Sequence, residues 1–120
     1  MNETNHYLLI VLLVIIFLLL LCNKKEGFTS HPVFRMYYTT WCGYSQKALP
    51  EFEALGNEVI SDSGQIIKIE KVDCDNNEQL CQTARIEGYP TIRLEHDSSI
   101  SDYNGARETE SMLEYLKNFF

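Results

Sequence analysis

An unbroken apolar run over residues 7–22 limits how the rest of this 120-residue chain can fold. Its 16 residues include no Lys, Arg, Asp or Glu, so a helix formed there has no charged face. As a helix the run spans roughly 24 Å, slightly short of the ~30 Å hydrocarbon core of a bilayer. Such a run is a cleaved signal peptide, a buried core helix or an uncleaved membrane anchor.

The flanks of the run favour the anchor. A signal peptide usually starts with cationic residues and ends in small ones. Residues 1–6 contain no Lys or Arg, and residues 18–23 read Leu-Leu-Leu-Leu-Cys-Asn. We therefore expect a short tail (1–6), a transmembrane anchor (7–22), a polar linker (23–32) and one globular domain (33–120).

Charges beside the run predict its orientation. Lys24 and Lys25 follow the run directly, and no Lys or Arg precedes it. The positive-inside tendency then places the globular domain on the cytoplasmic side, although two lysines are a small bias. Cys22, at the end of the run, is either a palmitoylation site or one more apolar residue, and we favour the second interpretation.

The globular part is acidic. Residues 33–120 hold eight of the ten Lys and Arg residues and 15 of the 17 Asp and Glu residues, a net charge of −7. Such a surface repels phosphate backbones, which argues against nucleic-acid binding. It also repels anionic lipid headgroups, so the apolar run has to provide the anchoring.

Residues 33–120 alternate short β-like and helical stretches, which predicts an α/β domain. The expected element order is βαβαββα. In chain order the elements are a strand at 33–39, a helix from about 42 to 59, a strand at 65–73, a helix at 76–85, strands at 91–95 and 100–103, and a helix at 107–118. A helix joins the first two strands, so they should be parallel, whereas a tight turn makes the last two antiparallel.

Two helices have a clear apolar face. In the first, Pro50 should produce a kink. Its inward residues are Ala48, Leu49, Phe52, Leu55 and Val59. The inward residues of the last helix are Met112, Leu113, Leu116 and Phe119.

Cys42 lies where the first strand ends and a helix begins. Free backbone N–H groups and the helix dipole stabilise a thiolate at such a position. A lowered thiol pKa raises the thiolate fraction near neutral pH, so Cys42 is a candidate nucleophile. A buried structural cysteine explains the position equally well.

Several short motifs decide between these interpretations. Residues 37–45 read Tyr-Tyr-Thr-Thr-Trp-Cys-Gly-Tyr-Ser, and Leu-Pro-Glu-Phe-Glu follows at 49–53. Lys-Val-Asp stands at 71–73, Gly-Tyr-Pro-Thr-Ile at 88–92 and Tyr-Asn-Gly-Ala-Arg-Glu at 103–108. In this order the motifs resemble thioredoxins and, most closely, the catalytic domains of protein disulfide isomerases. The resemblance implies a thioredoxin-like fold with Cys42 in its active site. That fold should be shortened, because the linker leaves no room for the first strand and helix of full-length thioredoxins.

The resemblance also implies a client-binding surface. Pro90 matches the cis-proline that faces the active-site cysteine, and the backbone beside it holds an extended client peptide. Trp41 matches the exposed aromatic residue beside the thiol. The client-binding residues implied in this way are Trp41, Gly43, Tyr44, Tyr89, Pro90 and Thr91.

The sequence departs from the family pattern at two positions. Ser45 replaces the second cysteine of Cys-x-x-Cys, and Met36 replaces the buried acid that serves that cysteine. The matching lysine, Lys71, therefore remains without that buried acid as a partner. Arg107 matches an arginine that, in disulfide isomerases, modulates the thiol pKa; the alternative is a solvated residue in the first turn of a helix.

These differences change the expected chemistry. Cys42 can form mixed disulfides with cysteine-containing protein clients, and the Ser45 hydroxyl can hydrogen-bond its thiolate but cannot expel the client. Release then needs glutathione or another client thiol. No cofactor or metal is expected.

Cys74 and Cys81 form a second pair with three interpretations. The resemblance implies a structural disulfide or a second redox pair, and two buried free thiols are the alternative. A disulfide would indicate an oxidising compartment, such as the lumen of the endoplasmic reticulum, against the lysine-based orientation. Similar compact anchored thioredoxin proteins occur in large DNA viruses, whose membranes face the reducing cytosol, which would reconcile the lysine-based orientation with the fold.

The leading hypothesis is a membrane-anchored monothiol thiol–disulfide oxidoreductase or isomerase. The first alternative is a non-catalytic thiol-retention or binding module, as in Cys-x-x-Ser proteins of the secretory pathway. The second rests on residues 42–45, which resemble the Cys-Gly-Phe-Ser of cluster-binding monothiol glutaredoxins. That family has a lysine shortly before the cysteine, and residues 36–41 contain none.

Overall fold

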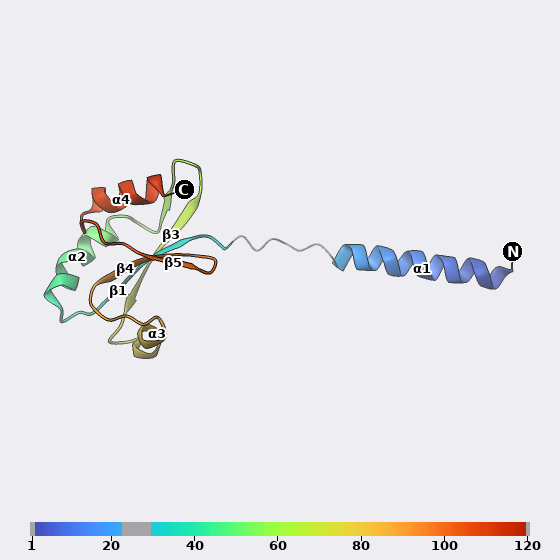
Figure 1. The fold of residues 1–120 in the computed structure, drawn as a ribbon, viewed down its shortest axis with the longest axis horizontal. Helices are drawn as coiled ribbons and strands as arrows, with labels where there is room; N and C mark the ends of the chain where they lie inside the picture. The colour runs from blue at the N-terminus through green and yellow to red at the C-terminus, as the bar shows by residue number, and fades with distance from the viewer. Residues whose placement is uncertain (1, 23–29, 120) are drawn as a thin grey trace.

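The computed structural model describes residues 2–22 and 30–119 (Figure 1). Helix α1 runs Glu3–Cys22, so it begins four residues before the expected anchor. Its 20 residues span ~30 Å at about 1.5 Å per residue, and the helix is long and apolar enough to cross a membrane. The predictions for Lys24, Lys25 and most of the linker lie outside the described residues.

A five-stranded mixed sheet forms the centre of the domain, in the order β2-β3-β1-β4-β5. The strands are β1 (Val33–Tyr38), β2 (Glu58–Ile60), β3 (Ile66–Asp73), β4 (Thr91–His96) and β5 (Ser99–Asp102). β1 is parallel to β3 and antiparallel to β4, and β5 is antiparallel to β4. The parallel first pair and the antiparallel last pair confirm the expectations from connection length.

Strand β2 is absent from the predicted order. It forms an antiparallel hairpin with β3, with Val59 opposite Ile67. The predicted helix ends early, because Gly56 has a φ of +79°, outside the helical region. The prediction that Val59 lies on the helix is therefore wrong. Its spacing fits a helical period, but its buried side chain comes from an edge strand.

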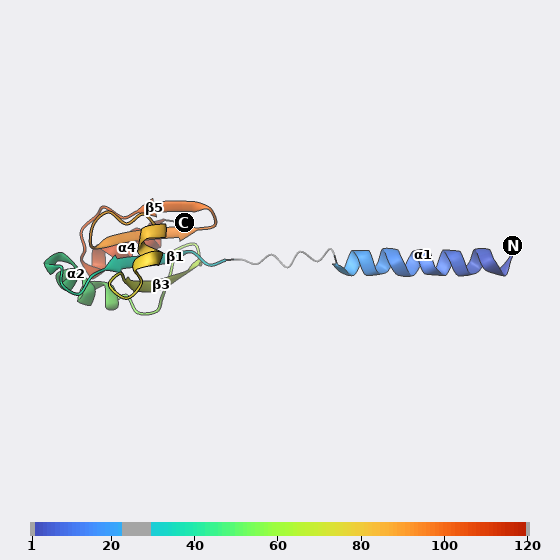
Figure 2. The ribbon, with the colours of Figure 1, turned by 90° about the horizontal axis from the view of Figure 1, so that it is seen from below.

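Helices α2 (Gly43–Glu53) and α4 (Thr109–Asn118) cover one face of the sheet, and α3 (Glu78–Thr83) lies on the other (Figures 1 and 2). Both α3 and α4 begin two residues later than expected. The main core lies between the sheet and helices α2 and α4. It contains Phe34, Met36, Ala48, Phe52, Leu55, Val59, Ile67, Ile92, Leu94, Met112 and Leu116.

The predicted inward face of α4 needs one correction. Met112 and Leu116 are fully buried and Leu113 packs against the core. Phe119, however, is 44% exposed, with its ring centroid 5.4 Å from that of Tyr115. Phe119 is the C-cap residue with a helical backbone, so its ring packs on Tyr115 one turn earlier at the exposed end of the helix.

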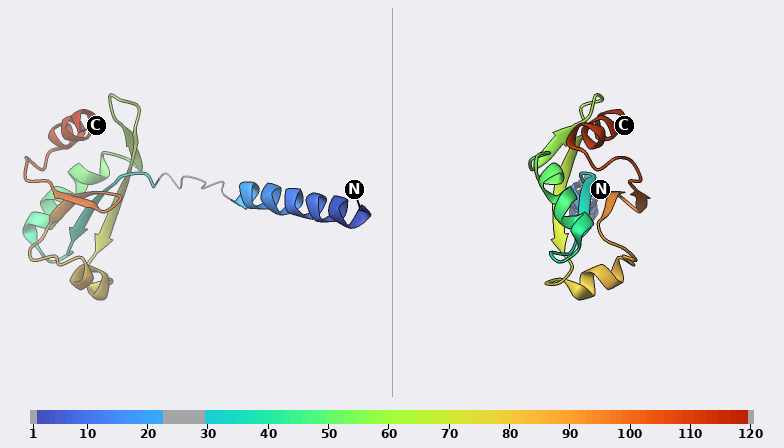
Figure 3. Two further views of the ribbon diagram at one scale, coloured as in Figure 1. Left: turned by 45° about the vertical axis from the view of Figure 1, so that its right-hand side comes forward. Right: turned by 90° about the vertical axis from the view of Figure 1, so that its left-hand side faces the viewer.

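The start of α2 lies at the opposite end of the sheet from the start of β1 (Figures 1 and 3). Strand β1 connects these ends with six residues, about 20 Å at 3.3 Å per residue. Cys42, which follows β1, therefore lies far from the point where the chain enters the sheet.

Candidate active site

Cys42 is the N-cap residue of α2. Its backbone is extended, with φ −82° and ψ 122°, and its carbonyl accepts the first helical hydrogen bond, from Gln46 N at 3.0 Å. The side chain is half-buried. The thiol therefore lies beside the N–H groups that the first turn leaves without helical partners.

These groups lower the pKa of Cys42. The main cause is the backbone N–H of Ser45, which hydrogen-bonds the thiolate against the opposing effect of desolvation. The Tyr44 N–H, the Ser45 hydroxyl and the charge of Arg107 act in the same direction. The uncharged thiol can instead donate to Tyr89 O, 3.6 Å from Sγ. A larger thiolate fraction near neutral pH makes Cys42 a better nucleophile.

Ser45 occupies the position of a resolving thiol. Its side chain is fully buried, and its Oγ accepts a hydrogen bond from Thr39 N at 3.3 Å. Among the described residues, the free cysteines are Cys22 and Cys42, and Cys22 lies in α1. The described part of the domain thus offers Cys42 no second free thiol.

Aromatic side chains surround the thiol. Trp41 and Tyr44 are 68% and 71% exposed. The ring of Tyr89 meets that of Trp41 edge-on, with centroids 6.2 Å apart. The Tyr89–Pro90 peptide bond is cis, and Thr91 Oγ1 donates to Gly88 O at 2.6 Å. The structure thus gathers the residues that the sequence assigned to client binding around the start of α2 and the start of β4.

Arg107 adds its charge to the thiol site from the loop before α4. It is exposed, as the alternative held, but it precedes α4 and does not lie in the first helical turn. With Tyr44, Lys47 and Glu51 of α2 it lines an open groove of about 600 Å³. Tyr103 Oη donates to Ala106 O at 2.6 Å, a contact within the loop that carries Arg107.

Lys71 lacks the buried acid of the family pattern, as expected, and pairs with a different, exposed carboxylate. Met36 is fully buried in the core, as its apolar side chain requires, but Lys71 Nζ forms an ion pair with Glu53 Oε1. Glu53 ends α2, and only the packing of that helix against the sheet brings it to β3. Both side chains are about half exposed, so the pair does not replace a buried base.

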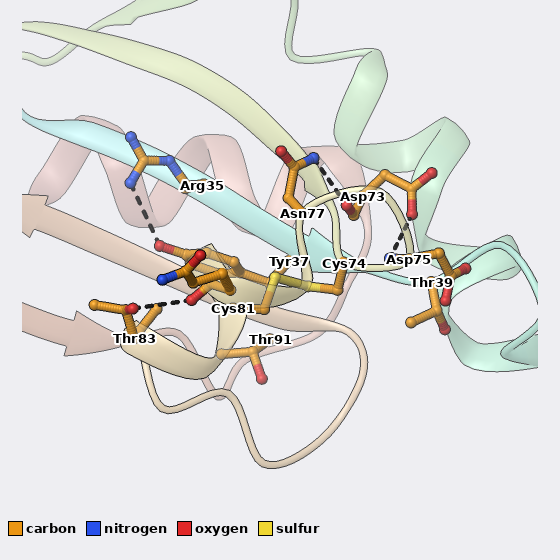
Figure 4. The surroundings of a disulfide bond; sticks show 12 residues. Arg35, Tyr37, Thr39, Asp73, Cys74, Asp75, Asn77, Cys81, Thr83 and Thr91 are labelled. Atoms are coloured by element: carbon orange, nitrogen blue, oxygen red, sulfur yellow. Dashed lines mark hydrogen bonds between the residues drawn. A yellow bond between two sulfur atoms is a disulfide. The ribbon is translucent and has the colours of Figure 1, made fainter.

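Cys74 and Cys81 form a disulfide, with their Cα atoms 5.8 Å apart. Both are buried with Tyr37 (Figure 4). Ile86 and Tyr89 pack against this cluster. The structure therefore agrees with the two interpretations in which these cysteines are paired, and not with two free thiols.

Asp75 belongs to the site but was not predicted from the sequence. Its carboxylate accepts hydrogen bonds from Trp41 Nε1 (3.0 Å), Thr40 Oγ1 (3.3 Å) and Thr40 N (3.4 Å). One signal was available: parallel strands end at the same edge of a sheet, so residues just after β3 should lie near those just after β1.

Comparison with known proteins agrees with this geometry. Residues 25–118 match the family described as Thioredoxin, so the chain belongs to the thioredoxin family. Its relatives include Protein disulfide-isomerase 1 of Dictyostelium discoideum, 38% identical over 92 residues, which are 74% of this chain and 25% of that protein. Protein disulfide-isomerase of Aspergillus niger is 36% identical over 86 residues, 70% of this chain and 16% of that protein.

Solved structures give the same result. Human ERp44 form I has a TM-score of 0.63 at 26% identity, covering 78% of this chain and 27% of the other. The first thioredoxin domain of mouse Protein disulfide-isomerase A4 has a TM-score of 0.59 at 25% identity, covering 84% and 67%. The chain spans only about a sixth to a quarter of the length of these two curated relatives. It is a thioredoxin-fold protein, and its curated relatives include protein disulfide-isomerases.

Proposed function

We propose that this chain is a membrane-anchored monothiol exchange protein that forms mixed disulfides with cysteine-containing protein clients through Cys42. One observation carries the proposal: an activated thiol at the start of α2, with a buried serine where a resolving thiol would stand. The length and composition of α1 support the anchoring.

The chemistry begins with the Cys42 thiolate. It attacks one sulfur of a client disulfide, forms the Cys42–client disulfide and expels the other client sulfur as a thiolate, which takes a proton from water. The exposed aromatic side chains of Trp41 and Tyr44 offer apolar contact to the client segment. Ser45 has no sulfur, so the mixed disulfide cannot close into a disulfide between residues 42 and 45.

Release needs a thiol from outside the domain. A second client cysteine can attack the mixed disulfide, form a new client disulfide and return Cys42 as thiolate; this is isomerisation, without net electron transfer. Glutathione can attack instead, returning Cys42 and leaving a glutathione–client mixed disulfide. The rate of client release therefore depends on whether the client has a second cysteine or on the glutathione concentration.

The second candidate function is retention of clients as long-lived mixed disulfides. It is favoured by the buried Ser45 and by the disulfide that occupies Cys74 and Cys81, since neither can resolve a bound client. The lifetime of the mixed disulfide in the presence of glutathione separates turnover from retention.

A trapping experiment tests the proposal. The full-length chain in detergent micelles is mixed with a disulfide-bearing peptide, quenched with acid and run on a non-reducing gel, with Cys42→Ala as the control. We expect an adduct that depends on Cys42. Ser45→Cys should shorten its lifetime at least about tenfold, because an internal thiolate attacks at a high effective concentration.

Glutathione is then added to the preformed adduct. Release within minutes supports turnover, and persistence for hours supports retention. Absence of any Cys42-dependent adduct contradicts both functions.

A further inference from the structure

Asp75 links the Cys74–Cys81 disulfide to the turn that carries the active-site thiol. It directly follows Cys74, and its two carboxylate oxygens accept three hydrogen bonds from Thr40 and Trp41. The strongest by geometry runs from the Trp41 indole Nε1 to Oδ1 at 3.0 Å. Hydrogen bonds to an ionised acceptor are stronger than those between neutral groups. The exposed Trp41 side chain is thus held by a carboxylate 34 residues away in the chain.

The backbone around Asp75 is itself held firmly. Cys74 N donates to Tyr38 O at 2.8 Å, which extends the pairing of β3 with β1 past the end of the strands. Asp75 N and Asn76 Nδ2 both donate to the side chain of Asp73, each at 3.0 Å. The disulfide to Cys81 then closes this turn onto α3 (Figure 4). Closing a loop covalently removes alternative arrangements of the residues inside it.

A second chain of contacts, through Tyr89, joins the same disulfide to Trp41. Tyr89 packs against the buried cluster of Tyr37, Cys74 and Cys81. The Tyr89 ring meets the Trp41 ring at 6.2 Å, and its carbonyl oxygen lies 3.6 Å from Cys42 Sγ. Trp41 therefore contacts both Asp75, which directly follows Cys74, and Tyr89, which packs against the disulfide cluster.

We propose that Asp75, held by the Cys74–Cys81 disulfide, is a positioning residue that fixes Trp41 against Tyr89 on the client-binding side of Cys42. The inference rests on the proposed function, because the fixed aromatic pair is the surface that receives a client. It assigns the disulfide a role beyond stability: without it, Trp41 samples other rotamers and a client meets an unformed surface.

Trp41 fluorescence tests the positioning directly, since the sequence contains 1 Trp. The full-length chain in detergent micelles is compared with Asp75→Ala, Asp75→Asn and the double variant Cys74→Ala/Cys81→Ala. Glu78→Ala is the matched control, because within the described residues that α3 carboxylate accepts a hydrogen bond from Gln82 Nε2 of its own helix and none from Thr40 or Trp41. Far-UV circular dichroism checks that each variant is folded.

We expect acrylamide to quench Trp41 about twice as efficiently in Asp75→Ala and in the double variant, since the indole loses its partner. Asp75→Asn should lie nearer the wild type, because its amide oxygen still accepts the indole N–H. The rate of adduct formation with the peptide disulfide should fall about three- to tenfold in the same two variants. Alkylation of Cys42 by iodoacetamide, which needs no client surface, should change less than about twofold.

Folded Asp75→Ala protein with wild-type quenching and adduct rate overturns the proposal. So does a change in the double variant alone, because the disulfide would then act without Asp75. The fluorescence result does not need Cys42 chemistry: if wild type forms no adduct, the proposed function fails, and quenching still decides whether Asp75 positions Trp41.

Discussion

At the scale of single residues, the reactivity of Cys42 comes mainly from its own helix. The backbone N–H groups of Ser45 and Tyr44 and the Ser45 hydroxyl belong to the first turn of α2, and Arg107 is the one distant contributor to the lowered pKa. Folding therefore favours the ionised thiol. A thiol whose pKa is lowered on folding adds stability above its ordinary pKa, and that contribution is lost as pH falls through the lowered value.

The rate of Cys42 alkylation against pH should report these contributions. In a Cys22→Ser background, we expect the midpoint for wild type to lie below that of an ordinary cysteine. Ser45→Ala should move it upward, and Arg107→Gln should move it upward by less, because the Arg107 charge is the smallest of the named causes. Lys117→Gln, in the last turn of α4, is the control. A Ser45→Ala profile that superimposes on wild type contradicts the assigned role of the hydroxyl.

Residues within the motifs could be predicted, and their distant partners could not. Trp41, Cys42 and Ser45 lie where the sequence placed them, because strand, turn and helix follow one another locally. Asp75 and Glu53 escaped prediction because their partners are 34 and 18 residues away, and only the packing of the sheet brings each pair together. The redox form of Cys74 and Cys81, seven residues apart, was open because it also depends on the redox compartment.

At the scale of elements, α2 caps α4. Thr109 N donates to Glu51 Oε2 at 2.8 Å, and Thr109 Oγ1 donates to the same oxygen at 2.5 Å and to Glu51 O at 2.9 Å. The N-cap residue of α4, Glu108, makes no side-chain cap of its own. A carboxylate of one helix thus satisfies a free N–H of the next.

Replacing Glu51 by Ala should lower Tm by about 2–5 °C at pH 7, because the start of α4 loses this partner. The hydrogen bonds from Thr109 lower the pKa of Glu51. The stabilisation is therefore present above the ordinary Glu pKa of about 4.3 and lost as pH falls through the lowered value. Thermal melts at a series of pH values, with Glu114→Ala as control, should show the Tm difference shrinking only in acid. A difference that is constant down to pH 2 contradicts the capping role.

The elements themselves were only partly predictable. The motifs located β1, β3, β4 and α2. Residues 55 and 59 also fit the spacing of the apolar face of α2, so the short strand β2 was not predicted. A three-residue edge strand has too few residues for a period, and it is defined by pairing with β3. Helix α4 starts later than expected because the Glu51 carboxylate accepts a hydrogen bond from the backbone N–H of Thr109, the first helical residue.

At the scale of the whole molecule, two features favour opposite sides of a membrane. Lys24 and Lys25 favour a cytoplasmic domain, whereas a buried disulfide is typical of an oxidising compartment. We give the disulfide more weight, because it closes the turn beside the active site and two lysines are a small charge bias. The domain is accordingly expected on the non-cytoplasmic side, with Cys42 at the end of the sheet away from the anchor.

Labelling of sealed membrane vesicles tests this arrangement with the full-length Cys22→Ser chain, in which Cys42 is the one free thiol. A maleimide that cannot cross membranes should label Cys42 only after the vesicles are opened, when they are prepared with the cytoplasmic face outward. The chain should also resist extraction by alkaline carbonate. Leu12→Arg with Ile16→Arg should release it, because each charge at the helix centre costs about 2.5–3.5 kcal/mol for insertion; the matching Ala pair should stay bound. Labelling of intact vesicles would instead place the domain in the cytoplasm, where the disulfide would have to persist against reducing thiols.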